Sequence, residues 1–144
     1  MAHLPKGKRE RTKLANREAI LAAARDVFAR LGYGATTVRD IIRATEYGVY
    51  VAKLGGGSVN TASGDFVFGM TEAYLIENGQ ITEPLREGNL IGNGPQVLRD
   101  IDLLGNDFAM GNPGTCGKDG QGVPVGDGQP TLRVKSLTIG GTAA

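Results

Sequence analysis

Histidine and cysteine, two residue types that often hold a catalytic metal, occur once each, as His3 and Cys116, and tryptophan is absent. A single cysteine cannot form a disulfide within the chain, so we expect a reducing, cytoplasmic location. No apolar run approaches the ~18 residues of a membrane span, and the basic N-terminus lacks the apolar core of a secretion signal. We therefore expect no membrane association.

Glycine is abundant and unevenly placed, with 3 of the 23 glycines before residue 44 and 20 after it. The net charge of the chain changes sign at the same point. Residues 1–43 carry ten Lys/Arg and four Asp/Glu, net +6, whereas residues 44–144 carry six and eleven, net −5. This shift predicts two unlike segments joined near residues 40–47.

Residues 1–13 form a basic arm. One interpretation is a tail that contacts nucleic-acid phosphates without reading sequence. The other, which we favour, is a solvated and disordered terminus. The candidate phosphate contacts, including two residues of the following helical region, are Lys6, Lys8, Arg9, Arg11, Lys13, Thr37 and Arg39.

Residues 14–45 predict a helical hairpin. Apolar residues from Ile20 to Leu31 recur at helical spacing, Asn16 suits the start of the helix, and Gly32 suits its end. Thr37 and Asp40 have the spacing of a capping box, which predicts a second helix after the turn.

The order of phrases in this hairpin resembles the start of a TetR-family DNA-binding domain over residues 12–45. The resemblance implies the first two helices of a helix-turn-helix unit, whose next helix would read bases. Here that next segment contains Val49-Tyr50-Val51, which favours strand, and then Gly55-Gly56-Gly57. The reading helix is therefore missing, and only non-specific nucleic-acid contact is predicted.

Residues 46–144 predict a β-rich domain. Asn78-Gly79 lies between two strand-like runs and is a strong hairpin signal. Asn93-Gly94-Pro95 predicts the start of a short helix that reaches Leu103 or Leu104, and residues 131–139 predict a final strand. The fold class is thus α+β, a helical hairpin followed by a mostly antiparallel β domain with one short helix.

Cys116 lies in residues 115–130, where the content of glycine and proline predicts an irregular loop. Two interpretations of the thiol stay open. It can be a small buried apolar group, or an exposed thiol open to oxidation.

Residues 46–142 resemble the C-terminal part of the TldD/PmbA zinc metallopeptidases. The resemblance lies in whole phrases, among them Ser63–Phe68, Glu72–Gly79, Leu90–Gly94, Thr115–Lys118 and Gly128–Leu132. It implies zinc, a peptide substrate in an extended cleft, two histidines and a general-base glutamate from a His-Glu-x-x-x-His helix, and a cysteine ligand. Cys116 matches that cysteine.

The sequence contains no His-Glu pair, so Cys116 is the single candidate zinc ligand. We therefore expect a protein that is catalytically incomplete alone and that associates with itself or with a full-length TldD/PmbA-type relative. The alternatives are a TetR-like DNA-binding regulator and an interaction protein without chemistry. A His-Glu-x-x-x-His helix in a partner chain would favour the metallopeptidase class. Salt-dependent but sequence-blind DNA retention would reduce the DNA-binding alternative to charge attraction. No effect of Cys116→Ser on any measured property would favour the interaction protein.

Overall fold

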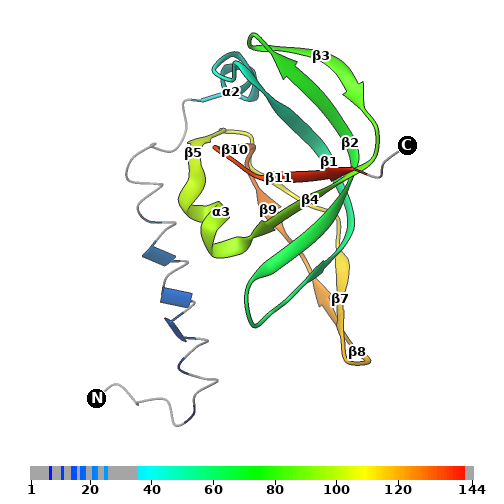
Figure 1. Cartoon of the computed structure of the whole chain (residues 1–144). Coiled ribbons are helices and arrows are strands. Elements are labelled where there is room, and N and C mark those ends of the chain that lie inside the picture. The colour runs from blue at the N-terminus through cyan, green and yellow to red at the C-terminus, as the bar shows by residue number, and fades with distance from the viewer. Residues whose placement is uncertain are drawn as a thin grey trace.

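The computed structural model describes residues 36–141 and, before them, residues 7, 11, 14–15, 17–18, 21–22 and 25. The described chain is mostly antiparallel β structure with two short helices (Figure 1). The described residues from 11 to 25 have helical backbone, but no helical hairpin is shown. The predicted turn at Gly32 and the predicted cap at Asn16 lie outside the described residues.

Eleven strands and two helices make up residues 38–141. The helices are α2 (Val38–Arg43) and α3 (Gly94–Asp100). The strands are β1 (Tyr47–Val59), β2 (Asp65–Glu77), β3 (Gln80–Leu85), β4 (Gly88–Asn93), β5 (Ile101–Leu104), β6 (Ala109–Met110), β7 (Gly114–Lys118), β8 (Gln121–Val125), β9 (Gly128–Gln129), β10 (Leu132–Val134) and β11 (Thr138–Gly141).

A five-stranded antiparallel sheet forms the body of the molecule. Its order is β1-β2-β4-β11, and β3 pairs with the other end of β2. The β1–β2 pair has irregular register between Val51 and Gly57. The glycines predicted to stop a helix therefore lie in a bulged part of strand β1, where missing side chains ease the bend.

The β2–β3 turn confirms the predicted hairpin. Asn78 and Gly79 both have positive φ, 52° and 73°, as a two-residue turn requires. A Cβ on Gly79 would lie 2.8 Å from the backbone oxygen of Arg43, so the turn also packs tightly against the end of α2. Glycine is needed at this position for both conformation and space.

Helix α2 begins with the predicted capping box. Thr37 Oγ1 accepts from the backbone N–H of Asp40, and Asp40 Oδ2 accepts from the backbone N–H of Thr37 at 2.9 Å. The helix buries Ile41, which is 5% exposed. Although the sequence assigned this segment to a separate helical unit, α2 lies against the β structure.

Arg133 on β10 joins α2 to the small β5–β10 sheet. Its Nε and Nη2 each donate to the carboxylate of Asp102 at 2.8 Å, and its Nη1 donates to the backbone oxygen of Ala44 at 2.6 Å. The hydrogen bonds from Arg133 lower the pKa of Asp102, and the same bonds raise the pKa of Arg133. This partly buried bidentate pair fixes the end of the helix.

Helix α3 starts where it was predicted and ends sooner. Asn93 caps it by accepting from the backbone N–H of Gln96, and Pro95 lies in its first turn. The prediction that the helix extends to Leu103 or Leu104 is wrong, because Ile101 is extended and pairs with Val134 of β10. Burial of Ile101 and this long-range pairing override the helical spacing of the apolar residues.

The predicted final strand is also divided in two. Its first part, β10, pairs with β5, and its second part, β11, pairs with β4 of the main sheet. The chain changes sheets at residues 135–137, close to the predicted irregularity at Ser136-Leu137.

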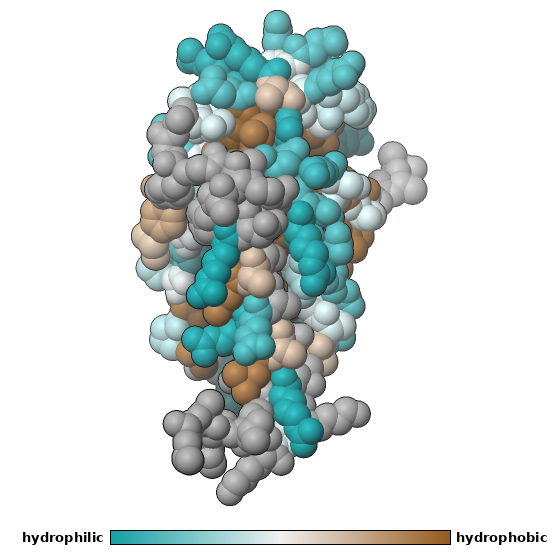
Figure 2. Space-filling view, turned by 90° about the vertical axis from the view of Figure 1, so that its left-hand side faces the viewer, coloured by the Kyte–Doolittle hydropathy of each residue, from teal (hydrophilic) through white to brown (hydrophobic). Residues whose placement is uncertain are grey.

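The core is small. Among the described residues, the buried hydrophobic side chains lie on β2, α2 and β5 and are Ile41, Met70, Ala73, Ile76 and Ile101. On the face that Figure 2 shows, hydrophobic surface appears at several separate places between hydrophilic residues. No helix among the described residues is long and apolar enough to cross a membrane.

Candidate functional site

Cys116 lies on a β-hairpin, not in the predicted irregular loop. Strands β7 and β8 pair in register, with Cys116 opposite Val123. Asp119 and Gly120 form the turn with φ of 51° and 77°. The prediction of a loop was wrong because Asp119 and Gly120 form a two-residue turn between paired strands, and because Pro124 is tolerated in a strand that pairs on one side.

The hairpin is the end of a longer exposed segment. Every residue from 106 to 129 is exposed, and we call this segment the exposed arm. Besides β7 and β8 it contains the short pair β6–β9. Its thiol is therefore accessible, and the interpretation of Cys116 as a buried apolar residue is wrong.

The described residues alone do not fit a zinc ion. They contain no group of three or more His, Cys, Asp or Glu side chains placed to hold a metal. The single histidine, His3, lies outside the described residues. Because zinc takes three or four protein ligands, Cys116 supplies only part of a site.

The candidate phosphate contacts are not brought together by the described structure. Lys6, Lys8, Arg9 and Lys13 lie outside the described residues, and Arg11 and Arg39 are exposed. The hydroxyl of Thr37 is already bonded to Asp40 Oδ2 at 2.6 Å. Contact with nucleic acid stays a prediction.

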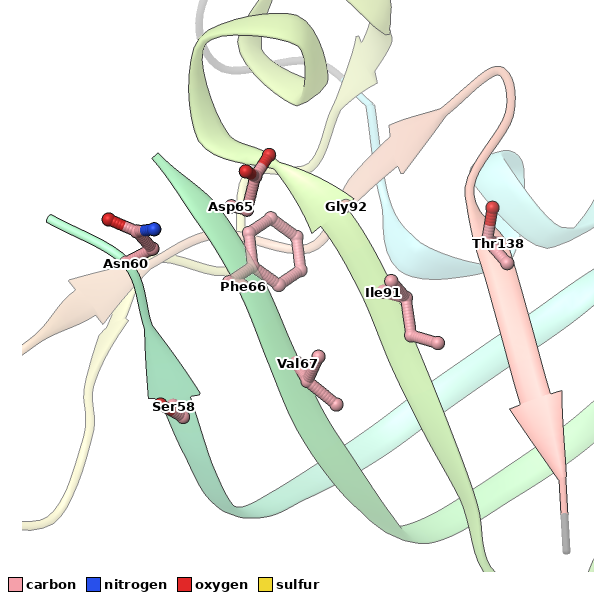
Figure 3. A pocket seen from close by; sticks show the side chains of 8 residues that line it. All are labelled: Ser58, Asn60, Asp65, Phe66, Val67, Ile91, Gly92 and Thr138. Atoms are coloured by element: carbon pink, nitrogen blue, oxygen red, sulfur yellow. The ribbon is translucent and has the colours of Figure 1, made fainter. Parts of the chain in front are cut away.

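A groove of about 420 Å³ crosses the main sheet (Figure 3). Its lining comes from β1, β2, β4, β11 and the β1–β2 loop. The lining residues are Ser58, Asn60, Asp65, Phe66, Val67, Ile91, Gly92 and Thr138. The groove could not be predicted from the sequence, because its members are up to 80 positions apart along the chain.

Asp65 lies at one end of the groove in a fixed hydrogen-bond network. Ser63 Oγ donates to Asp65 Oδ2 at 2.6 Å, and Asn93 Nδ2 donates to Asp65 Oδ1 at 2.9 Å. The hydrogen bond from Ser63, followed by that from Asn93, lowers the pKa of Asp65. The carboxylate is therefore held in place and ionised at neutral pH.

A second polar cluster lies on β1 and β2. Lys53 Nζ is 2.9 Å from Glu72 Oε2, and the hydroxyl of Tyr74 donates to Glu72 Oε1 at 3.0 Å. The hydrogen bonds from Lys53 and Tyr74 lower the pKa of Glu72, and the bond to Glu72 raises the pKa of Tyr74. Lys53 neutralises the carboxylate, so this exposed cluster is a cross-strand contact of the sheet.

The fold and the site together define a small antiparallel β domain that presents one accessible thiol and does not hold a metal through its described residues. Comparison with known families shows which family this domain belongs to. The model of the PmbA/TldA metallopeptidase C-terminal domain matches residues 8–141. The chain therefore belongs to the TldD/PmbA metallopeptidase family, as a homologue of its C-terminal domain.

Curated relatives agree with this assignment. The chain is 47% identical over 110 residues to a metalloprotease TldD homolog of Buchnera aphidicola. It is 35% identical over 108 residues to a zinc metalloprotease TldD homolog of Saccharolobus solfataricus. These matches cover 76% and 75% of this chain, but only 23% and 24% of the relatives. The chain thus spans about a quarter of their length.

A solved structure supports the fold. TldE from Thermococcus kodakarensis superposes with a TM-score of 0.57 at 21% identity, over 76% of this chain and 22% of that one. The family match runs from residue 8 through the expected junction near residues 40–47. The comparisons therefore give no support to a fused TetR-type segment over residues 12–45.

Proposed function

We propose that this chain acts as the cysteine-bearing C-terminal part of a TldD/PmbA-type zinc metallopeptidase, and that Cys116 becomes one ligand of a zinc ion. The observation that carries the proposal is the position of Cys116. It is the sole cysteine, it lies at the position that the family resemblance assigns to a ligand, and its hairpin leaves it exposed.

The remaining ligands come from a partner. The family resemblance implies a His-Glu-x-x-x-His helix, which this sequence does not contain. A full-length TldD/PmbA-type relative is the partner whose chemistry fits, and peptides are the substrate class. A reducing cytoplasm keeps the single thiol available for the metal.

Reconstitution tests this proposal. The chain is mixed with a separately produced segment of a TldD homolog that carries the His-Glu-x-x-x-His helix, and zinc content and peptide hydrolysis are measured. We expect zinc and hydrolysis in the mixture, and neither with Cys116→Ser. Thr115→Ser, in the same strand, serves as the control that retains both.

Two results would refute the assignment. Cys116→Ser could retain zinc and hydrolysis in the reconstituted mixture, which would remove Cys116 from the site. The mixture could also form a stable complex that excludes zinc, which would leave the peptidase relationship as ancestry only.

A further inference from the structure

The exposed arm is joined to the rest of the chain through a narrow base. The backbone N–H of Gly105 donates to the backbone oxygen of Thr131 at 2.6 Å, and the β6–β9 pair follows. Each of these two strands has two residues, and the β7–β8 hairpin with Cys116 lies beyond them (Figure 1). Opening of the β6–β9 pair would therefore change how the hairpin is held.

A methionine and an aromatic ring lie together on this base. Met110 is opposite Gly128 in the β6–β9 pair. A Cβ on Gly128 would lie 2.6 Å from Met110 Sδ and 2.9 Å from Phe108 Cζ, so these two atoms are at most 5.5 Å apart, the sum of the two distances. That separation is typical of a sulfur–aromatic contact. Glycine at position 128 leaves the space that both side chains occupy.

Met110 and Met70 differ in their access to solvent. Met110 is 68% exposed, whereas Met70 on strand β2 is 3% exposed. An oxidant must reach the sulfur atom to react with it, so exposure decides which methionine is modified. The two residues therefore form a matched pair within one chain, one open to a soluble oxidant and one shielded from it. The third methionine, Met1, lies outside the described residues.

Few contacts hold the base of the arm closed. All the residues of β6 and β9 are exposed, and Phe108 beside them is 53% exposed. The backbone N–H of Gly111 donates to the backbone oxygen of Asp127 at 2.8 Å, which extends the pair by one hydrogen bond. A two-stranded ribbon without a packed face is marginally stable in water. Loss of one favourable side-chain contact should therefore shift its opening equilibrium measurably.

We propose that Met110 is a site of reversible oxidation by a hydroperoxide, and that formation of the sulfoxide opens the base of the exposed arm. A lone pair of Met110 Sδ attacks the terminal peroxide oxygen and the O–O bond breaks. The attacked oxygen gives its proton to the departing oxygen, which leaves as water or an alcohol. The sulfur loses two electrons and the peroxide gains them.

The sulfoxide has a different preference from the thioether. It is polar and chiral, so it favours contact with water over contact with the Phe108 ring. Methionine sulfoxide is also restored to methionine by specific reductases, which makes the change reversible. The inference needs neither zinc nor a partner chain, so it does not depend on the proposed function.

The test is an NMR experiment on the full chain with isotope-labelled methionine methyl groups and hydrogen peroxide as the oxidant. The chain carries Cys116→Ser, so that no thiol consumes the peroxide. We expect the methyl signal of Met110 to convert to that of the sulfoxide at the rate of free methionine. The signal of Met70 should stay unchanged over the same time.

Hydrogen exchange then reports on the base of the arm. Oxidation should raise the exchange rate of the Gly111 amide about two- to tenfold, as expected for loss of one sulfur–aromatic contact. The amides of strand β2 should not change. Treatment with methionine sulfoxide reductases of both stereospecificities should restore the original rate at Gly111.

Matched variants separate oxidation from packing. Met110→Leu keeps an apolar side chain of similar volume but has no sulfur, so its exchange at Gly111 should not respond to peroxide. Met110→Gln places a polar group beside the ring and should raise the exchange without peroxide. Phe108→Leu removes the aromatic partner, so it should reduce the difference between the reduced and oxidised chains.

Three outcomes would overturn the proposal. The first is a Met110 that resists peroxide as Met70 does. The second is complete oxidation of Met110 with no change in exchange at Gly111. The third is an equal response to peroxide in Met110→Leu. None of these measurements uses zinc, so their failure and that of the proposed zinc site are read separately.

Discussion

The main sheet and the exposed arm are both antiparallel β structure, but they differ in burial. Strand β2 has neighbours on both sides and contributes Met70, Ala73 and Ile76 to the core, at 3–5% exposure. The arm contributes none, and its large apolar residues Phe108, Met110, Val123 and Val125 are 45–68% exposed. Hydrophobic burial therefore stabilises the sheet, while the arm depends on backbone pairing.

The difference in burial between the main sheet and the exposed arm predicts a difference in their local stability. A two-stranded hairpin without a packed face is marginally stable in water. Local stability is lowest where few apolar contacts exist. Under the proposed function, the final geometry of the exposed arm would therefore be set by the metal and the partner. The sheet, by contrast, has strand β2 paired on both sides and holds most of the buried side chains.

The largest expected effect comes from the core of the sheet. Ile76→Ala should lower the free energy of unfolding by about 2–5 kcal/mol, because it removes buried methylenes and leaves a cavity. Val123→Ala in the arm should change it by less than about 0.5 kcal/mol. Urea denaturation followed by circular dichroism measures both. Equal losses would show that the arm is packed in solution.

The Arg133–Asp102 pair should have an intermediate effect. Asp102→Asn should destabilise the chain by about 1–3 kcal/mol, because Arg133 loses a charged partner in a partly buried site. The pKa of Asp102 is lower in the folded state than in the unfolded state. The carboxylate therefore adds to the free energy of unfolding, and this contribution is fully present above the unfolded pKa. It is lost as the pH falls through the lower folded pKa.

Denaturation from pH 7 down to pH 2 checks the sign of this contribution. The difference in unfolding free energy between the parent chain and Asp102→Asn should shrink as acid protonates the carboxylate. Glu87→Gln, at an exposed position, is the control. A difference that does not change with pH would show that Asp102 acts through packing alone.

Some of these features follow from the sequence. The Asn78-Gly79 turn, the Thr37–Asp40 capping box and the start of α3 at Asn93 are local, because a few adjacent residues determine each of them. The cysteine ligand is suggested by a resemblance rather than by any local rule.

Other features are set by contacts between distant residues. Ile101 has helical spacing but pairs with Val134, and Ser58 and Thr138 meet in one row only after the sheet forms. The Cys116 hairpin is different. The pair Asp119-Gly120 is typical of a hairpin turn. The surrounding glycines and Pro124 disfavour strands, so the two strands on either side could not be predicted from the sequence.

The turn of the Cys116 hairpin offers a smaller test. Gly120 has φ of 77° with nothing within 4 Å of an added Cβ, so a side chain there is strained by conformation alone. Gly120→Ala should increase hydrogen exchange at β7 and β8 while leaving β2 unchanged. Spread of the change into β2 would mean that arm and sheet unfold as one unit.

The smallest expected effect is that of the thiol itself. Cys116→Ser should change the stability of the isolated chain by less than about 0.5 kcal/mol, because the side chain is exposed. In the unmodified chain, the thiol should react with a maleimide at the rate of a free cysteine. Protection from the reagent in the isolated chain would contradict the exposed arm.

The most direct test of the account is zinc-edge X-ray absorption of the chain reconstituted with the His-Glu-x-x-x-His segment of a relative. We predict one sulfur scatterer at about 2.3 Å, together with nitrogen or oxygen ligands. The sulfur should disappear with Cys116→Ser. Full zinc occupancy without a sulfur ligand in the parent complex would contradict the assignment of Cys116.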